Sequence, residues 1–246
     1  MSLNKKMFIQ AVLDNPSYWK NAPKHLRTDK ELALEIILLH KAYDNVFAQY
    51  LPDELKDDKE LMLTAVKHNA YVLKFISQRL KDDKDVALAA LKTDGMVLEY
   101  LSEKFKDDEK MVLVAVKNHG TALISASDRL KDNEEIVMAA IQDVSYSFEY
   151  ASDRLKDRKE LALVAVKDNG YMYKKISERL KKDPELMMLA YISKKSITNS
   201  FPEHIKLEVQ DLSPNAIVKY LEVLSLKESL EKESTSQNKE NKKIKL

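Results

Sequence analysis

Histidines and cysteines are the first residues to examine for metal binding and nucleophilic catalysis. No two of the five histidines, at positions His25, His40, His68, His119 and His204, have the spacing of paired metal ligands. The chain has no cysteine, which excludes a disulfide, a thiolate zinc site and a cysteine nucleophile. It also lacks a glycine-rich phosphate loop and a Gly-x-Ser-x-Gly motif. We therefore predict a protein that is not an enzyme and has no catalytic residue, metal or cofactor; an enzyme of unrecognised type is an alternative.

A row of lysines is the first feature whose spacing suits ligand binding. Its members recur at intervals of 25 residues, with Gln142 in place of one of them: Lys67, Lys92, Lys117 and Lys167. Such a row suits phosphate groups, but a cation near a helix C-terminus also stabilises the helix dipole. The net charge of +1 provides no general attraction for nucleic acid, and no regular series of aromatic rings accompanies the lysines. Binding of nucleic acid or another anionic surface is therefore the alternative function.

Aromatic residues form a second row. Tyr71, Tyr146 and Tyr171 share one position of the pattern, and Phe75, Tyr100 and Tyr150 share the position four residues later. On a helix, two residues four apart lie on the same face. The rings either seal the contact between neighbouring segments or anchor a protein partner. We predict that they bind protein, with the patch centred on residues 131–155.

Both rows follow from a 25-residue repeat. The tripeptide Leu-Lys-Asp begins at Leu55, Leu80, Leu130 and Leu155, with variants at Phe105 and Leu180. Repeat units therefore begin at Lys56, Lys81, Lys106, Lys131, Lys156 and Lys181, and a longer unit opens at Leu26. A fixed period of this length indicates an array of small units, each of which buries its apolar face against its neighbours.

Each unit is predicted to contain two short antiparallel helices. The first opens with Asp57 and, three residues later, Glu60, a spacing that resembles a capping box. Six mostly apolar positions follow, and a helix that is apolar almost all round is expected to be buried between its neighbours. One of these positions is always alanine, which predicts close approach of a neighbouring backbone: Ala65, Ala90, Ala115, Ala140, Ala165 and Ala190.

The second helix of a unit is expected after a glycine. At Gly95, Gly120 and Gly170 we expect a left-handed C-terminal cap of the first helix. The second helix then runs, in one unit, from Tyr171 to about residue 179, with one apolar stripe. Val144 and Ser145 replace the usual Asn-Gly in the unit at 131–155, so an altered turn is expected there. The predicted fold class is all-α, an α-solenoid of two-helix repeats.

The ends of the chain depart from the pattern. The solenoid is predicted to span residues 1–226, with degenerate end units at 1–26 and 206–226. Residues 227–246 have no apolar periodicity and are predicted to form a disordered polar tail. No segment approaches the roughly 20 apolar residues of a membrane span, and the N-terminus does not resemble a signal peptide.

The string LKDRKELALVAVKDNGY at residues 155–171 resembles a bacterial and protist repeat family catalogued only as a domain of unknown function. The resemblance covers about residues 27–205 and implies a helical repeat, without any catalytic or binding residues. Family members occur among the proteins that intracellular bacteria inject into host cells. The tail, with Glu228, Glu231 and Glu233 ahead of a polar stretch, is similar to the C-terminal signals of type IV secretion.

These features together predict a protein-binding solenoid. The resemblance further predicts that the protein is a virulence effector, which is secreted into a host cell through a type IV system and binds a host protein there. The expected location is the cytoplasm or nucleus of the host cell, and the cytoplasm of the producing cell is the alternative.

Overall fold

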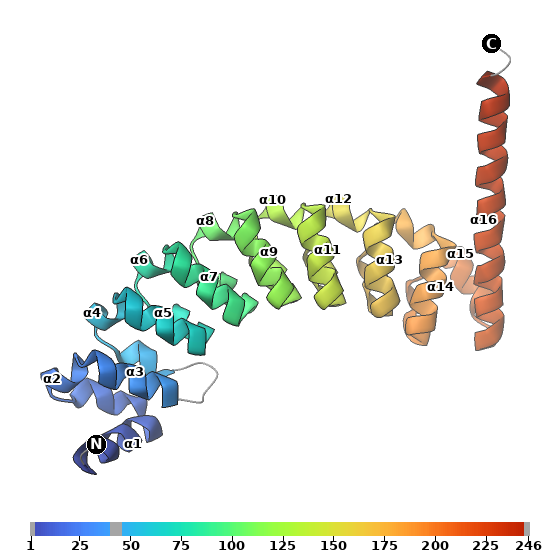
Figure 1. Ribbon diagram of the computed structural model, residues 1–246. Coiled ribbons are helices and arrows are strands. Elements are labelled where there is room, and N and C mark those ends of the chain that lie inside the picture. The colour runs from blue at the N-terminus through green and yellow to red at the C-terminus, as the bar shows by residue number, and fades with distance from the viewer. Residues whose placement is uncertain (1–2, 40–45, 244–246) are drawn as a thin grey trace. The chain divides into compact units, whose positions relative to one another are not determined.

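The computed structural model describes residues 3–39 and 46–243, and every regular element within them is a helix (Figure 1). The chain forms two compact parts, an N-terminal part of residues 1–143 and a C-terminal part of residues 144–246. The all-α repeat fold expected from the sequence is therefore confirmed.

One long α-helix begins each repeat unit. In the N-terminal part these are α1 (Leu3–Asp14), α3 (Lys30–Leu39), α5 (Lys59–His68), α7 (Lys84–Thr93), α9 (Glu109–Asn118) and α11 (Glu134–Asp143). In the C-terminal part they are α13 (Lys159–Asp168) and α14 (Pro184–Ser193).

A 3-10 helix and a single helical turn complete most units. The 3-10 helices of the N-terminal part are η1 (Pro16–Asn21), η2 (Val46–Tyr50), η3 (Ala70–Lys74), η4 (Gly95–Tyr100) and η5 (Gly120–Ser125). Those of the C-terminal part are η6 (Ser145–Tyr150), η7 (Gly170–Lys175), η8 (Leu180–Lys182) and η9 (Lys195–Ser200). The one-turn helices are α2 (Lys24–Arg27), α4 (Asp53–Lys56), α6 (Gln78–Lys81), α8 (Glu103–Lys106), α10 (Asp128–Lys131) and, in the C-terminal part, α12 (Asp153–Lys156).

The predicted second helix of each unit is thus two separate elements. In one unit, Ile176 has an extended backbone (φ −73°, ψ 165°) and ends η7. In another, the Ser77 hydroxyl accepts a hydrogen bond from the Leu80 N–H and so starts α6 as its N-cap. Ser127 and Ser152 start α10 and α12 in the same way, whereas Ser102 makes no such bond at α8 and a proline, Pro52, precedes α4. The predicted apolar positions are nevertheless buried, as Val72 and Leu73 show.

In the N-terminal part the long helices stack side by side as one layer and the 3-10 helices as a second. Helix α5 contacts α7, α7 contacts α9, and α9 contacts α11, while η4 contacts both η3 and η5 (Figure 1). The recurring alanines lie in the core of the two parts, and all six are fully buried. Burial of this apolar material between neighbouring units is the main stabilising term of such an array.

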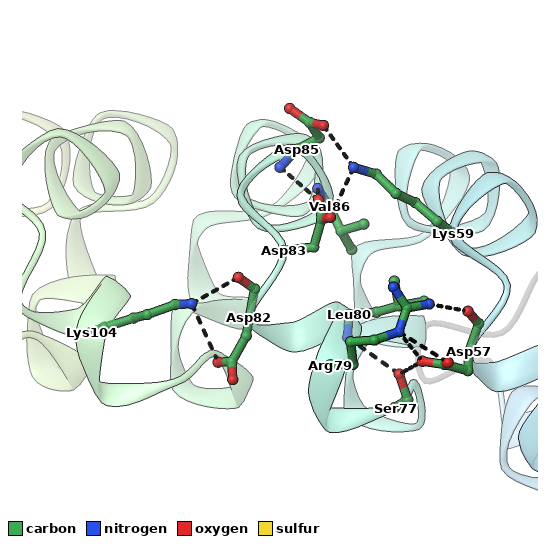
Figure 2. A network of polar contacts seen from close by, with 10 residues as sticks. All are labelled: Asp57, Lys59, Ser77, Arg79, Leu80, Asp82, Asp83, Asp85, Val86 and Lys104. Atoms are coloured by element: carbon green, nitrogen blue, oxygen red, sulfur yellow. Dashed lines mark hydrogen bonds and ion pairs between the residues drawn. The ribbon is translucent and has the colours of Figure 1, made fainter.

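Polar contacts join neighbouring units at their turns (Figure 2). Asp57 accepts hydrogen bonds from the Ser77 hydroxyl and from Arg79 Nε, at 2.9 Å, in the next unit. Lys59 bridges Asp83 and Asp85 of the next long helix, at 2.8 Å each. The Asp57 arrangement recurs at Asp107 with Ser127 and Arg129 and at Asp157 with Ser177 and Arg179.

The capping aspartate is one residue later than predicted. Asp58, not Asp57, is the N-cap of α5 and accepts a hydrogen bond from the Leu61 N–H at 2.8 Å. Asp83 caps α7 in the same way. Asp57 serves the contact with the next unit instead, so the capping-box interpretation of Asp57 and Glu60 is wrong.

The glycines do not cap helices in a left-handed conformation. Gly95 and Gly170 open 3-10 helices and are buried, and neither has a positive φ. A Cβ added to Gly95 would lie 2.1 Å from the carbonyl oxygen of Ala115, and one added to Gly170 would lie 2.6 Å from that of Ala190. Glycine is therefore needed because the backbone of the next long helix approaches so closely. Such a close approach was predicted from the recurring alanines.

The turn at Val144 keeps the usual backbone, contrary to expectation. Val144 has φ −137° and ψ 104°, close to the −134° and 98° of Asn169 in a regular unit. Only the hydrogen bond differs, because Asn169 accepts one from the Tyr171 N–H and a valine side chain has no acceptor.

The C-terminus is helical where disorder was predicted. After α15 (Glu203–Val209), helix α16 (Pro214–Lys243) packs its buried residues Ile217 and Leu221 near α14 and then continues through most of residues 227–246. This segment contains no glycine or proline and is rich in glutamate and lysine, which favour helix. Lack of an apolar stripe therefore did not prevent helix formation. Residues 244–246 lie outside the described residues.

Candidate binding surfaces

Each long helix leaves one face outside the core. In α5 the residues Leu61, Met62, Ala65 and Val66 are fully or almost fully buried. The opposite face carries Glu60, Leu63, Thr64 and Lys67, which have the spacing i, i+3, i+4 and i+7. Leu63 is half-buried, and the other three residues are exposed. The expectation that all six apolar positions are buried is therefore wrong for two of them.

A row of half-buried aliphatic side chains follows this face from helix to helix. In the N-terminal part its members are Leu34, Leu63, Leu88, Leu113 and Met138, and in the C-terminal part Leu163 and Met188. Leu or Met recurs here although the position is not enclosed by the core. We call this series the aliphatic row.

Two hollows open along the aliphatic row in the N-terminal part. One, of about 370 Å³, lies between α5 and α7 and is lined by Leu63, Leu88, Ala89, Lys67 and Lys92 among others. The second, of about 310 Å³, lies between α3 and α5, with Leu34 and Thr64 in its lining. The same groove between neighbouring long helices thus recurs one repeat apart.

The predicted lysine row lies along one edge of this face. Lys67, Lys92 and Lys117 are exposed near the C-terminal ends of α5, α7 and α9. None of the three forms an ion pair with a residue that the structure describes, whereas acids at the other edge are paired: Glu60 lies 2.7 Å from Lys30, and Asp85 lies 2.8 Å from Lys59. In the C-terminal part, Lys167 is exposed at the equivalent place in α13.

Two of the predicted aromatic residues of the N-terminal part, Tyr71 and Tyr100, lie on 3-10 helices, and Phe75 follows η3 as its C-cap. The rings of Tyr71 and Tyr100 pack edge to face with their centroids 6.4 Å apart, which joins η3 and η4. Phe75 is half-buried under the Lys74 ammonium, 5.8 Å from its ring centroid. A hydrogen bond to Glu99 raises the pKa of Tyr100 to about 12, and partial burial adds to the shift. These rings therefore contribute to contacts within the fold.

Among the predicted aromatic residues of the C-terminal part, Tyr146 is exposed and Tyr150 and Tyr171 are half-buried. Tyr146 is 41% exposed, and its ring packs edge to face on that of Tyr150 at 6.0 Å. Its hydroxyl donates a hydrogen bond to Glu149, and this bond raises the pKa of Tyr146 to about 12. Lys175 contacts the same Glu149 carboxylate. Tyr171 lies under two ammonium groups, Lys174 at 4.9 Å and Lys194 at 5.3 Å. The structure brings Tyr146 and Tyr150 together as predicted, and their role in binding stays a prediction.

The described residues contain no group of three or more histidines or carboxylates that could hold a metal ion. His40 lies outside them, and His119 contacts the Thr121 hydroxyl through Nδ1 at 2.8 Å. Within the same ranges no helix is long and apolar enough to span a bilayer.

The fold and its repeated faces define a helical-repeat protein. A family described as "Domain of unknown function (DUF4116)" matches residues 43–81, 58–106, 83–125, 108–156 and 158–206. These matches cover more than half of the sequence, and the chain belongs to this family, as the resemblance implied. Neither the curated proteins nor the solved structures include a match.

Proposed function

We propose that this chain is a non-catalytic module that binds a protein partner through the exposed faces of its long helices. The observation that carries the proposal is the aliphatic row with its two hollows. A repeat that only had to fold could place polar side chains at these half-buried positions. Leu or Met at every one of them instead provides apolar area for a partner, and an apolar patch of this kind is typical of an interaction surface.

The test is partner capture by the full chain with a matched pair of substitutions. Leu88→Gln removes apolar surface from the row and keeps the length and helix propensity of the side chain. Ile124→Gln makes a similar change at a residue that is 47% exposed on η5, in the other layer. We expect Leu88→Gln to reduce capture from host-cell lysate by at least about tenfold, or roughly 1.4 kcal/mol, and Ile124→Gln to leave it unchanged. The reverse order would contradict the proposal, provided that circular dichroism shows both variants folded.

We further propose that the partner is a host protein and that the chain is a bacterial effector delivered through a type IV system. Two observations support this: the resemblance to injected proteins and the glutamate-rich C-terminal segment. The absence of cysteine fits a reducing compartment such as the host cytoplasm or nucleus. A reporter enzyme fused to the chain should be detected inside host cells only when the bacteria have a working secretion system. Removal of residues 227–246 should abolish the signal; equal delivery by the truncated chain would contradict a signal in this segment.

The exposed lysines Lys67, Lys92 and Lys117 support anion binding as the second candidate function. A phosphate binder that uses Lys67, Lys92 and Lys117 would lose affinity steeply as salt is added. Apolar contacts with the aliphatic row persist at high salt. A partner that still binds at high salt and loses affinity in Leu88→Gln would therefore favour protein binding over phosphate binding.

A further inference from the structure

The floor of the outward surface of α5, α7 and α9 is mostly aliphatic, and the hollow between α5 and α7 opens on it. The floor consists of three pairs of adjacent residues: Leu63 with Thr64, Leu88 with Ala89, and Leu113 with Val114. We call this surface the α5–α9 face. No aromatic ring belongs to these pairs, so the floor offers no platform on which a nucleobase could stack. Leucine and valine instead suit the apolar side chains of a peptide.

The charge on the α5–α9 face is one-sided. At the C-terminal edge stand Lys67, Lys92 and Lys117, exposed and without an ion pair to the residues that the structure describes. At the N-terminal edge, Glu60 and Asp85 are already neutralised by Lys30 and Lys59.

Helix α9 has Lys110 at the place that Glu60 and Asp85 occupy in the preceding helices. The third helix therefore adds a cation at the edge where the first two have paired acids. A segment bound here would meet uncompensated positive charge along the C-terminal edge. At the N-terminal edge it would meet the paired acids of α5 and α7, and on α9 the adjacent opposite charges of Glu109 and Lys110. An acidic partner is complementary to this distribution, and a basic one is not.

The spacing of the helices matches the period of a helical partner. Neighbouring packed helices lie about 8–10 Å apart, and two turns of an α-helix rise about 10.8 Å. A partner helix crossing α5, α7 and α9 would therefore place one equivalent residue, about every seventh, over each of them. The apolar side chains of the partner that cover the helices, and its acids beside the lysines, would then recur with the same period along one stripe of the partner helix.

From these observations we propose that the α5–α9 face binds an acidic amphipathic helix of a partner protein. Its apolar side chains pack over Leu63, Leu88 and Leu113, with one of them in the hollow between α5 and α7, and its carboxylates lie along Lys67, Lys92 and Lys117. This inference rests on the proposed function and adds the location of the site and the chemistry of the partner.

Two synthetic helical peptides of about three heptads test the proposal directly. Both have leucines along one stripe; the first has glutamates along the adjacent edge, and the second has lysines in their place. We expect the full chain to bind the glutamate peptide at least about tenfold more tightly than the lysine peptide, as measured by fluorescence anisotropy. Equal affinities, or no binding of the glutamate peptide, would overturn the proposal. Tighter binding of a single-stranded oligonucleotide than of the glutamate peptide would also overturn it, in favour of a nucleic-acid site.

A charge-reversal variant locates the site. Replacing Lys67, Lys92 and Lys117 with glutamate should reverse the preference between the two peptides. The matched control replaces Lys6, Lys24 and Lys74 with glutamate; these residues are exposed and lie outside the α5–α9 face. Both variants have the same net charge, so an equal loss of affinity in the control would show general electrostatics and overturn the site.

The two proposals fail in different ways. If a lysate partner is captured through Leu88 while the glutamate peptide binds no better than the lysine peptide, the acidic-helix site is wrong and protein binding through the aliphatic row stands. If Leu88→Gln leaves capture intact while the peptide preference is as expected, the face binds acidic helices but does not account for capture of the partner.

Discussion

Gly95→Ala provides a sharp test of how the repeat units stack. Gly95 opens η4 against the backbone of α9, where an added Cβ would lie 2.1 Å from the Ala115 carbonyl oxygen and 2.9 Å from its carbonyl carbon. Both atoms belong to the backbone, so no side-chain rotation relieves the contact. Either η4 or α9 must move to accommodate one methyl group.

Three terms determine the size of the effect. Overpacking in a close-packed interior costs about 1–3 kcal/mol. The displacement also weakens the hydrogen bond from the Gly95 N–H to Asn118 Oδ1, now 2.7 Å long, and such a bond contributes about 0.5–1.5 kcal/mol. In the opposite direction, replacing glycine stabilises by about 0.4–1 kcal/mol by restricting the unfolded chain. The sum is a net destabilisation of about 0.5–4 kcal/mol.

Urea unfolding of the full chain, followed by circular dichroism, measures this change. Gly170→Ala should also destabilise, but less, because the corresponding distance to the Ala190 oxygen is 2.6 Å. Lys117→Ala, at an exposed residue, should change the free energy of unfolding by less than about 0.5 kcal/mol. A Gly95→Ala variant that is more stable than the natural chain would show that the close approach of η4 and α9 is wrong, since only the unfolded-state term would remain.

Three further predictions concern packing, pH and the tyrosines. Ala115→Leu should destabilise by about 1–3 kcal/mol through overpacking, in the same urea experiment; a neutral effect would mean that Ala115 does not face η4. Hydrogen bonds from Ser77 and then Arg79 lower the pKa of Asp57, and one from Lys59 lowers the pKa of Asp83. A carboxyl with a lowered pKa stabilises the fold fully above its unfolded pKa of about 3.9 and ceases to do so as the pH falls through its folded pKa. The melting temperature should therefore fall below about pH 4. It should fall less in Asp83→Asn, which preserves the helix cap, and an identical pH profile in that variant would refute the role of Asp83. Alanine at both Tyr146 and Tyr150 should abolish partner capture if these rings anchor the partner, and undiminished capture by a folded variant would exclude them.

The glycines and capping residues show where local patterns mislead. A glycine at the end of a helix is usually explained by a left-handed cap, and Asp with Glu three residues later by a capping box. At Gly95 and Asp57 both residues act on the next unit instead, through the carbonyl of Ala115 and through Ser77 and Arg79. A pattern within one repeat contains no information about which neighbour lies opposite, so contacts between units could not be read from it.

The candidate site also has one part that the local sequence predicts and another that only packing between units decides. The lysine row could be predicted because a lysine side chain is almost never fully buried unless it is paired. The aliphatic row could not, because Leu63 and Met62 are both apolar neighbours in sequence, and only stacking decides that Met62 is enclosed while Leu63 faces outward. Recurrence of Leu or Met at this position was the available signal, but burial explained it equally well.

The amino-acid sequence by itself determined the period, the helical class and the core alanines. Each of these depends on short-range periodicity, and 25-residue recurrence preserves it from unit to unit. The tertiary structure alone decided that Ser77 starts a separate helix, that Gly95 is required by the approach of α9, and that Leu63, Leu88 and Leu113 stay half-buried beside three exposed lysines. The physical reason is that these properties depend on distances between atoms of different units, which result from packing rather than from the pattern within any one unit.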